Sequence, residues 1–110
     1  MILWLSGAVS GKPDRNAEEF RRASCRLWDA GFCVLSPLSI VAEGAPWEVA
    51  MRQAVSAMLK CNGVARLPDW RESRGARIES RLAKDLGMPV KDVSEWAKEA
   101  ENDVPAENGR

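Results

Sequence analysis

The chain of 110 residues contains no histidine. Histidine is the commonest general base and the commonest metal ligand in proteins. Any acid–base chemistry must therefore come from carboxylates, lysines or cysteines. We expect neither a metal ion nor a cofactor.

The chain also lacks an excess of charge of either sign, because 16 Lys and Arg residues balance 16 Asp and Glu residues. A nucleic-acid polymer or an anionic membrane is therefore not favoured as a partner, since both attract basic proteins. No apolar stretch is long enough to span a bilayer, and residues 1–5 lack the basic start of a signal peptide. We expect a cytoplasmic protein.

Cysteine is scarce, and Cys25, Cys33 and Cys61 form no C-x-x-C pair. An odd number of cysteines without that spacing argues against a disulfide framework and against a zinc site. We expect all three to be buried as small apolar side chains.

Short apolar runs alternate with segments of helical periodicity. Buried strands are expected at residues 2–6, 32–36 and 63–67, and a short edge strand at 88–90. Amphipathic helices are expected between them, at residues 16–31, 47–59 and 73–87. This order predicts an α/β fold, a compact flavodoxin-like or Rossmann-like three-layer sandwich with a parallel sheet of about four strands.

The boundaries of these elements follow from capping and turn residues. Asn16 with Glu19 three residues later predicts the start of the first helix, and Ser73 is expected as the N-cap of the third. The long connection at 37–46 is a candidate binding loop. Residues 1–90 form the predicted domain, and residues 91–110 are expected to add a short helix anchored by Trp96 and a polar, disordered tail.

The loop after the first strand has the sequence S-G-A-V-S-G-K at residues 6–12. Gly7 and Gly11 let the backbone approach a phosphate or a sugar, and Ser10 and Lys12 add hydrogen-bond donors. The loop matches neither the P-loop nor the dinucleotide-binding fingerprint, so ATP and NAD chemistry of those two types is disfavoured. A tight strand-to-helix turn would use the same glycines.

The segment S-R-G-A-R-I-E at residues 73–79 follows the third strand and opens a helix. Ligands of α/β proteins bind beyond the carboxyl ends of the strands, where helix N-termini stabilise anions. Glu79 falls on or beside the inward stripe formed by Ala76, Leu82, Ala83 and Leu86. A buried acid is costly unless it faces a cavity or has partners, so Glu79 is a candidate nucleophile or base. The alternative is a solvated carboxylate that pairs with basic neighbours on the helix.

Tryptophan side chains could stack on a nucleobase. Trp47 lies on a helix stripe and is expected in the core, whereas Trp70 lies in a loop beside the predicted anion site. Three arginines flank that loop and could bind a phosphate, although solvent exposure is the default for at least two of them: Arg71, Arg74 and Arg77.

Three segments together resemble the nucleoside 2-deoxyribosyltransferase-like superfamily and, within it, a small, mostly phage-encoded domain of unknown function. They are L-S-G-A-V-S-G at 5–11, G-V-A-R-L-P-D-W at 63–70, and S-R-G-A-R-I-E at 73–79, the last followed by Ala83 and by L-G-M-P-V at 86–90. The resemblance covers residues 1–90. It implies cleavage of the N-glycosidic bond of 2′-deoxynucleosides or their 5′-monophosphates, with Glu79 as the nucleophile that forms a covalent deoxyribosyl-enzyme. Water or a second base then resolves this intermediate.

The resemblance also implies a binding pocket for a small-molecule nucleoside or nucleotide. Ser73 matches a serine that contacts the 5′-phosphate, Gly7 matches the glycine loop of the same pocket, and Trp4 stands at an aromatic position. With its neighbours, the expected binding set is Trp4, Ser6, Gly7, Ala8, Ser10, Gly11, Trp70, Ser73, Arg74 and Gly75. A homodimer or higher homo-oligomer in the cytoplasm of a bacterial host is also implied.

The chain departs from the family pattern at Ala54 and Asn62, which align with two family aspartates. The first of these aspartates protonates or orients the leaving base, and general acid catalysis is typically worth about 10²–10⁴ in rate. Either another acid substitutes, Asp69 and Glu72 being nearest in sequence, or ordinary turnover is lost.

Three functions therefore stay open. The first is an N-glycosidase or deoxyribosyltransferase with Glu79 as nucleophile and Asp69 as the second catalytic residue. The second is a catalytically impaired protein of phage type that sequesters or senses a nucleotide in the same pocket. The third is a structural or interaction protein that keeps the fold alone.

Overall fold

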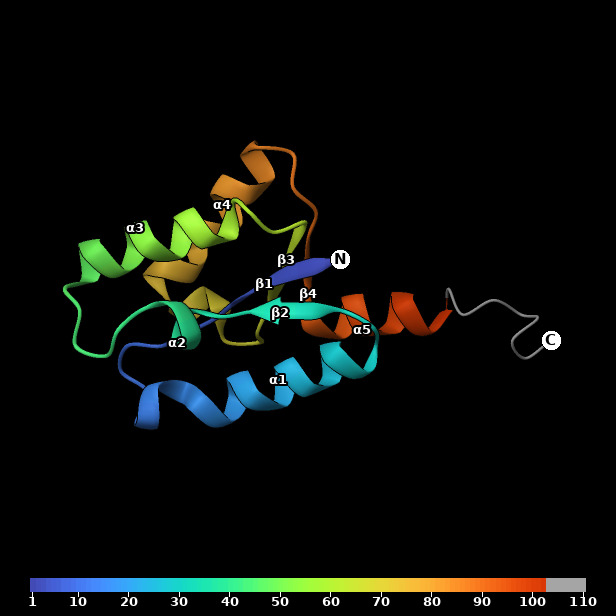
Figure 1. Cartoon of the computed structure of the whole chain (residues 1–110), viewed down its shortest axis with the longest axis horizontal. Coiled ribbons are helices and arrows are strands. Elements are labelled where there is room, and N and C mark those ends of the chain that lie inside the picture. The colour runs from blue at the N-terminus through green and yellow to red at the C-terminus, as the bar shows by residue number, and fades with distance from the viewer. Residues whose placement is uncertain (103–110) are drawn as a thin grey trace.

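The computed structural model describes residues 1–102 and shows a four-stranded sheet with helices on both faces (Figure 1). The strands are β1 (Ile2–Ser6), β2 (Cys33–Leu35), β3 (Gly63–Arg66) and β4 (Val90–Asp92). The longer helices are α1 (Ala17–Asp29), α3 (Trp47–Met58), α4 (Arg74–Asp85) and α5 (Val93–Asn102). Three short helical segments complete the chain: η1 (Pro13–Asn16), α2 (Pro37–Ile40) and η2 (Trp70–Glu72).

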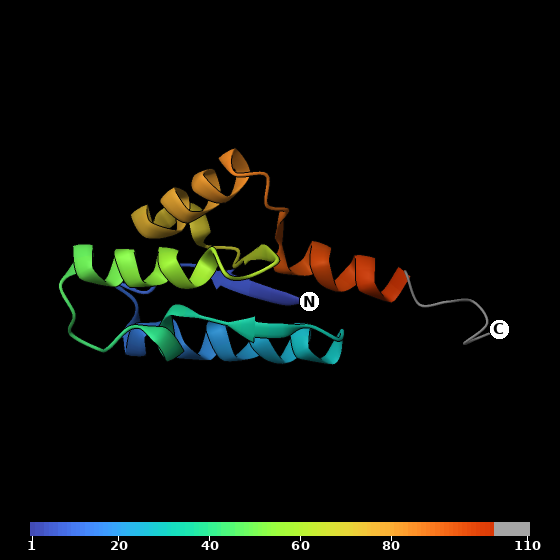
Figure 2. The same cartoon turned by 45° about the horizontal axis from the view of Figure 1, so that its top comes forward.

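The strands lie in the order β2-β1-β3-β4, and all neighbouring pairs are parallel. The chain leaves β1 toward β2 and then crosses back to β3 on the other side of β1. This reversal places α1 on one face of the sheet and α3 and α4 on the other, while α5 returns to pack against α1 (Figures 1 and 2). The predicted parallel three-layer α/β fold is confirmed, with the strand order of flavodoxin-like proteins.

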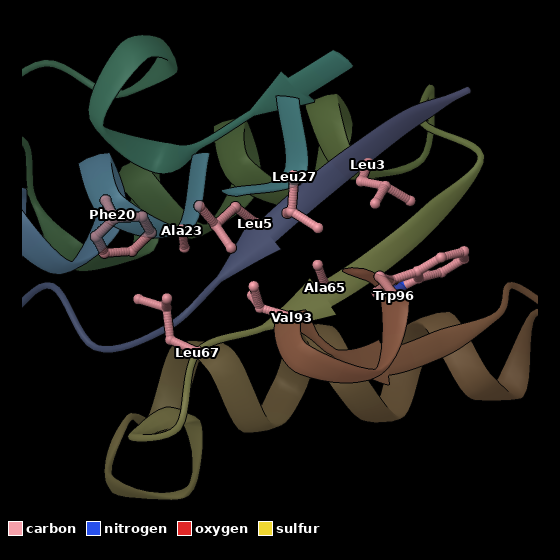
Figure 3. Packing of buried hydrophobic residues seen from close by; sticks show 9 residues of the cluster. All are labelled: Leu3, Leu5, Phe20, Ala23, Leu27, Ala65, Leu67, Val93 and Trp96. Carbon is pink, nitrogen blue, oxygen red and sulfur yellow. The ribbon is translucent and has the colours of Figure 1, made fainter. Parts of the chain in front are cut away.

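Alternate side chains of β1 enter two separate cores. Leu3 and Leu5 face α1 and α5 and belong to the cluster drawn in Figure 3. Trp4 enters the opposite cluster, which β3, α3 and α4 complete: Trp4, Ala54, Ala57, Met58, Cys61, Val64 and Ala83. The α3–α4 face is the one that carries the site described below.

Helix α5 is part of the domain rather than an appendage to it. Trp96 is 5% exposed, and its Nε1 donates a hydrogen bond to the carbonyl oxygen of Val64 at 2.8 Å. The expected boundary after residue 90 falls inside β4, whose last residue leads directly into α5. Residues 101–102 of the expected polar tail end α5, and residues 103–110 lie outside the described part of the chain.

Two sequence predictions on the β2 side are wrong. β2 pairs only with β1 and is an edge strand, so Cys33 is exposed rather than covered on both faces. Cys25 is also exposed, on the outer side of α1, which leaves Cys61 as the buried cysteine. Within residues 1–102, every helix is too short or too polar to cross a membrane.

Candidate functional site

The start of α4 sets the orientation of Glu79. Ser73 is the N-cap, as predicted, and its Oγ accepts a hydrogen bond from the backbone N–H of Ala76 at 3.1 Å. The buried face of the helix then consists of Gly75, Ala76, Glu79, Ser80 and Ala83. Glu79 is 5% exposed, so the prediction that it points inward is confirmed and the solvated alternative is wrong. Leu86, expected on the same stripe, is 57% exposed because α4 ends before it.

The carboxylate of Glu79 is held from β1. Its Oε1 accepts hydrogen bonds from Trp4 Nε1 at 3.0 Å and from Ser6 Oγ at 2.7 Å. Trp4 and Ser6 are fully buried side chains of β1 that face α4. Burial raises the pKa of Glu79 above its ordinary value, and the two hydrogen bonds oppose this rise because they stabilise the ionised form.

Glu79 forms part of the wall of a cavity of about 90 Å³. The other walls come from the loop after β1, the segment around α2, α3 and the first turn of α4. The lining residues are Gly7, Val9, Ser10, Arg15, Pro37, Val41, Trp47, Ala50, Met51, Ala54, Ser73, Gly75, Ala76 and Glu79. Glu79 is the one acidic residue of this lining set and Arg15 is the one basic residue.

Two of the expected glycines lie in close contact with other side chains at this site. A Cβ added at Gly7 would lie 2.5–2.9 Å from side-chain atoms of Leu67, at the end of β3. A Cβ added at Gly75 would lie 2.8 Å from Sδ of Met51, which also lines the cavity. The loop after β1 therefore reaches its position because Gly7 has no side chain, whereas at Gly75 the contact is with the flexible end of the Met51 side chain.

The structure does not place Asp69 in the lining of the cavity. One of its carboxylate oxygens accepts a hydrogen bond from the backbone N–H of Ala8 at 3.1 Å, and the other accepts one from Asn16 Nδ2 at 2.9 Å. Lys12 Nζ lies 3.7 Å from the same carboxylate. Asp69 thus ties the loop after β1 to η1, and its predicted catalytic role stays a prediction.

Trp47 and Trp70 both lie in surroundings that differ from those expected. The ring of Trp70 is covered by the guanidinium groups of Arg66 at 4.2 Å and Arg71 at 4.7 Å, and Trp70 is not in the cavity lining. Trp47, expected in the core, is only half-buried and lines the cavity. Arg74 lies over the ring of Trp47 at 4.2 Å and so borders the site without lining it. Trp47 is therefore the aromatic wall of the site.

Of the expected binding set, Gly7, Ser10, Ser73 and Gly75 line the cavity, and Trp4 and Ser6 reach it through Glu79. Ala8 and Gly11 are outside the lining. Ala8 instead contributes the backbone N–H that Asp69 accepts.

Ala54 and Asn62, which the resemblance aligns with two aspartates, have different surroundings. Ala54 is 3% exposed and lines the cavity. Asn62 lies at the opposite end of the sheet, where its Oδ1 accepts a hydrogen bond from the backbone N–H of Ile2 at 2.7 Å. Only the first position can affect chemistry at Glu79.

Sequence reasoning missed Arg15. The residue lies in η1, where Asp14, Arg15 and Asn16 all have a positive φ. The predicted start of α1 at Asn16 is confirmed, because Asn16 is the N-cap residue, but its φ is 63° and its side chain forms no cap hydrogen bond. Pro13 signalled a turn, but no residue pattern signals three consecutive left-handed residues without glycine.

The fold and the site define a small parallel α/β protein with a buried carboxylate in a cavity beside the carboxyl end of its first strand. Residues 1–92 match the model of the family DUF4406, described as a domain of unknown function, and the chain belongs to that family. Comparisons with curated proteins and with solved structures gave no match.

Proposed function

We propose that this protein cleaves the N-glycosidic bond of 2′-deoxynucleosides or their 5′-monophosphates, or transfers the deoxyribosyl group, with Glu79 as the nucleophile. One observation carries the proposal. Glu79 is buried on the wall of a cavity, and β1 fixes one of its carboxylate oxygens through Trp4 and Ser6. The resemblance of residues 5–11, 63–70 and 73–79 to the nucleoside 2-deoxyribosyltransferase-like superfamily supports the same function.

The reaction follows the logic of a retaining glycosidase. A carboxylate oxygen of Glu79 attacks C1′, the C1′–N bond breaks, and its electron pair leaves with the base. Water or a second base then attacks C1′ and loses a proton to solvent, and the C1′–O bond to Glu79 breaks and releases the ionised carboxylate. The leaving base takes up a proton, either from a donor outside the lining set or from solvent, because Ala54 cannot supply it.

Trp4 and Ser6 prepare the carboxylate for this attack. An indole N–H can only donate, so it stabilises the ionised form of Glu79 and cannot accept a proton from the neutral form. Both donors bind Oε1 and so leave Oε2 as the oxygen that can attack. Burial removes the water that would otherwise stabilise the carboxylate and reduce its reactivity.

Substrate entry requires a wall of the cavity to move. Its volume of about 90 Å³ is below the roughly 300–1,000 Å³ of typical small-molecule sites. Residues 37–46, the long connection that supplies Pro37 and Val41 to the wall, contain one short helix and are the segment best suited to open.

A second function has its own supporting observation. Ala54 occupies the cavity wall, and Glu79 is the one acid among the lining residues. A protein of phage type that binds a nucleotide without turning it over would need no general acid. The homodimer or larger oligomer implied by the resemblance stays a prediction under either function.

A proton-NMR time course of the purified protein with 2′-deoxynucleosides and their 5′-monophosphates tests the proposal. We expect the anomeric signal of the nucleoside or nucleotide to decay with the wild type and not with Glu79→Gln. Glu99→Gln, at an exposed carboxylate of α5 on the far side of the molecule from the cavity, is the matched control and should keep wild-type activity. Ligand line broadening without decay would favour the nucleotide-binding protein, and the absence of both effects would contradict both functions.

A further inference from the structure

The most unusual backbone in the described chain is the turn at residues 14–16. Asp14, Arg15 and Asn16 have φ values of 49°, 55° and 63°, the left-handed region that residues other than glycine rarely adopt. Asp and Asn tolerate this region, but each residue with a larger side chain costs about 1–2 kcal/mol there. Arg15 is the residue of the three least suited to its conformation.

Other contacts hold the turn in this shape. Asn16 Nδ2 donates to the carbonyl oxygen of Ala8 and to the carboxylate of Asp69, both at 2.9 Å. Arg15 Nη2 donates to the carbonyl oxygen of Val41 at 3.1 Å. The turn is therefore fixed to the loop after β1 on one side and to the α2 segment on the other. Strain that the surrounding structure maintains is typical of ligand sites.

The turn brings a guanidinium group to the cavity wall. Arg15 lines the cavity with Ser10 of the loop and Ser73 at the start of α4. The ion pairs formed among residues 1–102 include none between Arg15 and Glu79, so the positive charge is not neutralised by the cavity's acid. A guanidinium group has five N–H donors, and the hydrogen bond to Val41 uses one of them.

We propose that Arg15 binds the phosphate of the substrate, and that this residue selects 2′-deoxynucleoside 5′-monophosphates over nucleosides. The inference rests on the proposed function and names its substrate class. A phosphate monoester carries about two negative charges at neutral pH, and a guanidinium group matches its oxygens in a bidentate geometry. Ser10 and Ser73 supply neutral hydroxyl donors beside the same position.

The test measures binding in a Glu79→Gln background, where substrate survives the titration. Calorimetry compares matched pairs of 2′-deoxynucleosides and their 5′-monophosphates. Arg15→Gln removes the charge, and Arg15→Asn removes it with a residue that tolerates a positive φ. Arg26→Gln, on the exposed side of α1, is the control. Wild-type kcat/KM for the same pairs provides the second readout.

We expect the Glu79→Gln protein to bind monophosphates more tightly than nucleosides. Both Arg15 variants should weaken monophosphate binding by about 10- to 100-fold and change nucleoside binding by less than about twofold, as for the loss of a charge-assisted contact. Arg26→Gln should change neither. Thermal unfolding of each variant reports any loss of folding separately.

Three results would overturn the proposal. The first is an equal loss of affinity for nucleosides and monophosphates in the Arg15 variants. The second is the absence of a preference for monophosphates in the Glu79→Gln protein that retains Arg15. The third is the absence of any binding. Cleavage of both substrate classes at the same kcat/KM would contradict Arg15 as the selector and leave Glu79 chemistry intact. Selective, Arg15-dependent binding without any cleavage by the wild type would contradict the chemistry and leave Arg15 as the phosphate ligand.

Discussion

At the scale of single residues, Glu79 is buried and accepts two hydrogen bonds from residues 1–102, both on one oxygen. Its folded-state pKa lies above that of the unfolded chain. A group of this kind contributes its full share of stability below the unfolded pKa, and that contribution is lost as the pH rises through the folded pKa. The ionised carboxylate that the proposed reaction needs therefore lowers the stability of the fold.

The first prediction concerns the stability that the ionised Glu79 carboxylate costs the fold. Glu79→Gln should raise the free energy of unfolding by about 1–2 kcal/mol at pH 8, because a neutral amide can still accept from Trp4 and Ser6. The difference should vanish below about pH 3, well under the unfolded pKa, where Glu79 is protonated in both states. Urea unfolding at several pH values measures it. A stability gain of Glu79→Gln that grows toward acid pH would contradict the expected direction of the pKa shift. The control variant Glu72→Gln should show no increase of stability with pH relative to the wild type.

The second prediction concerns the donors from β1. Ser6→Ala removes one of the two hydrogen bonds that favour the ionised carboxylate. The acid limb of the kcat/KM profile should then move up by about one pH unit, since one unit corresponds to about 1.4 kcal/mol. Ser10→Ala, which alters the cavity wall without touching Glu79, should leave that limb in place. An unchanged limb in Ser6→Ala would mean that the hydroxyl does not tune the carboxylate.

At the scale of elements, α4 depends on Ser73 for its first turn, and the same residue faces the cavity. The two roles can be separated. Ser73→Ala should cost about 1 kcal/mol of stability, whereas Ser73→Asp should keep the cap because Asp is an equally good N-cap residue. The Asp variant places a negative charge in the cavity and should lose monophosphate binding at least tenfold while remaining folded. Thermal melts and monophosphate titrations of both variants check this. If the Ser73→Asp protein bound the monophosphate as tightly as the wild type, the phosphate would have to bind away from Ser73.

The loop after β1 and η1 depend on Asp69. In Asp69→Asn, one side-chain oxygen can still accept from Ala8, but an amide N–H₂ would then face the amide of Asn16. We expect the free energy of unfolding to fall by about 1–2 kcal/mol, with the shape of the pH–rate profile retained.

Asp85→Asn, at an exposed carboxylate near the end of α4, is the control for this substitution. A stable Asp69→Asn protein that loses the alkaline limb of its pH–rate profile would instead identify Asp69 as the acid of the reaction. The same two measurements therefore decide between a positioning residue and a catalytic one.

At the scale of the whole molecule, the face opposite the site provides stability without touching Glu79. Trp96 closes the core of α1 and α5, and its ring packs against Gly63 and Phe32. Trp96→Ala should cost about 3–5 kcal/mol, a large part of the 5–15 kcal/mol typical of a domain.

Trp28→Ala is the matched control because this side chain is 66% exposed, and it should cost less than about 0.5 kcal/mol. Chemical unfolding followed by circular dichroism compares the two variants. Equal effects would show that α5 does not belong to the cooperative unit.

Local periodicity determined most of the architecture. Apolar runs and helical stripes predicted three of the four strands and the three intervening helices close to their observed bounds. These patterns repeat every 2.0 residues in a strand and every 3.6 residues in a helix, so a short stretch of sequence is enough to recognise them. The same spacing predicted that Glu79 points inward, since Gly75, Ala76 and Ala83 bury the same face of α4.

Only the tertiary structure decided which helices, strands and loops come into contact. The exposure of Cys33 depends on β2 lying at the edge of the sheet, and the partners of Glu79 depend on β1 facing α4. Arg15 reaches the cavity through a left-handed turn that Val41 and Asp69 hold from distant parts of the chain. Contacts between segments far apart in sequence outweigh local preference at these positions, so no window of the sequence could contain them.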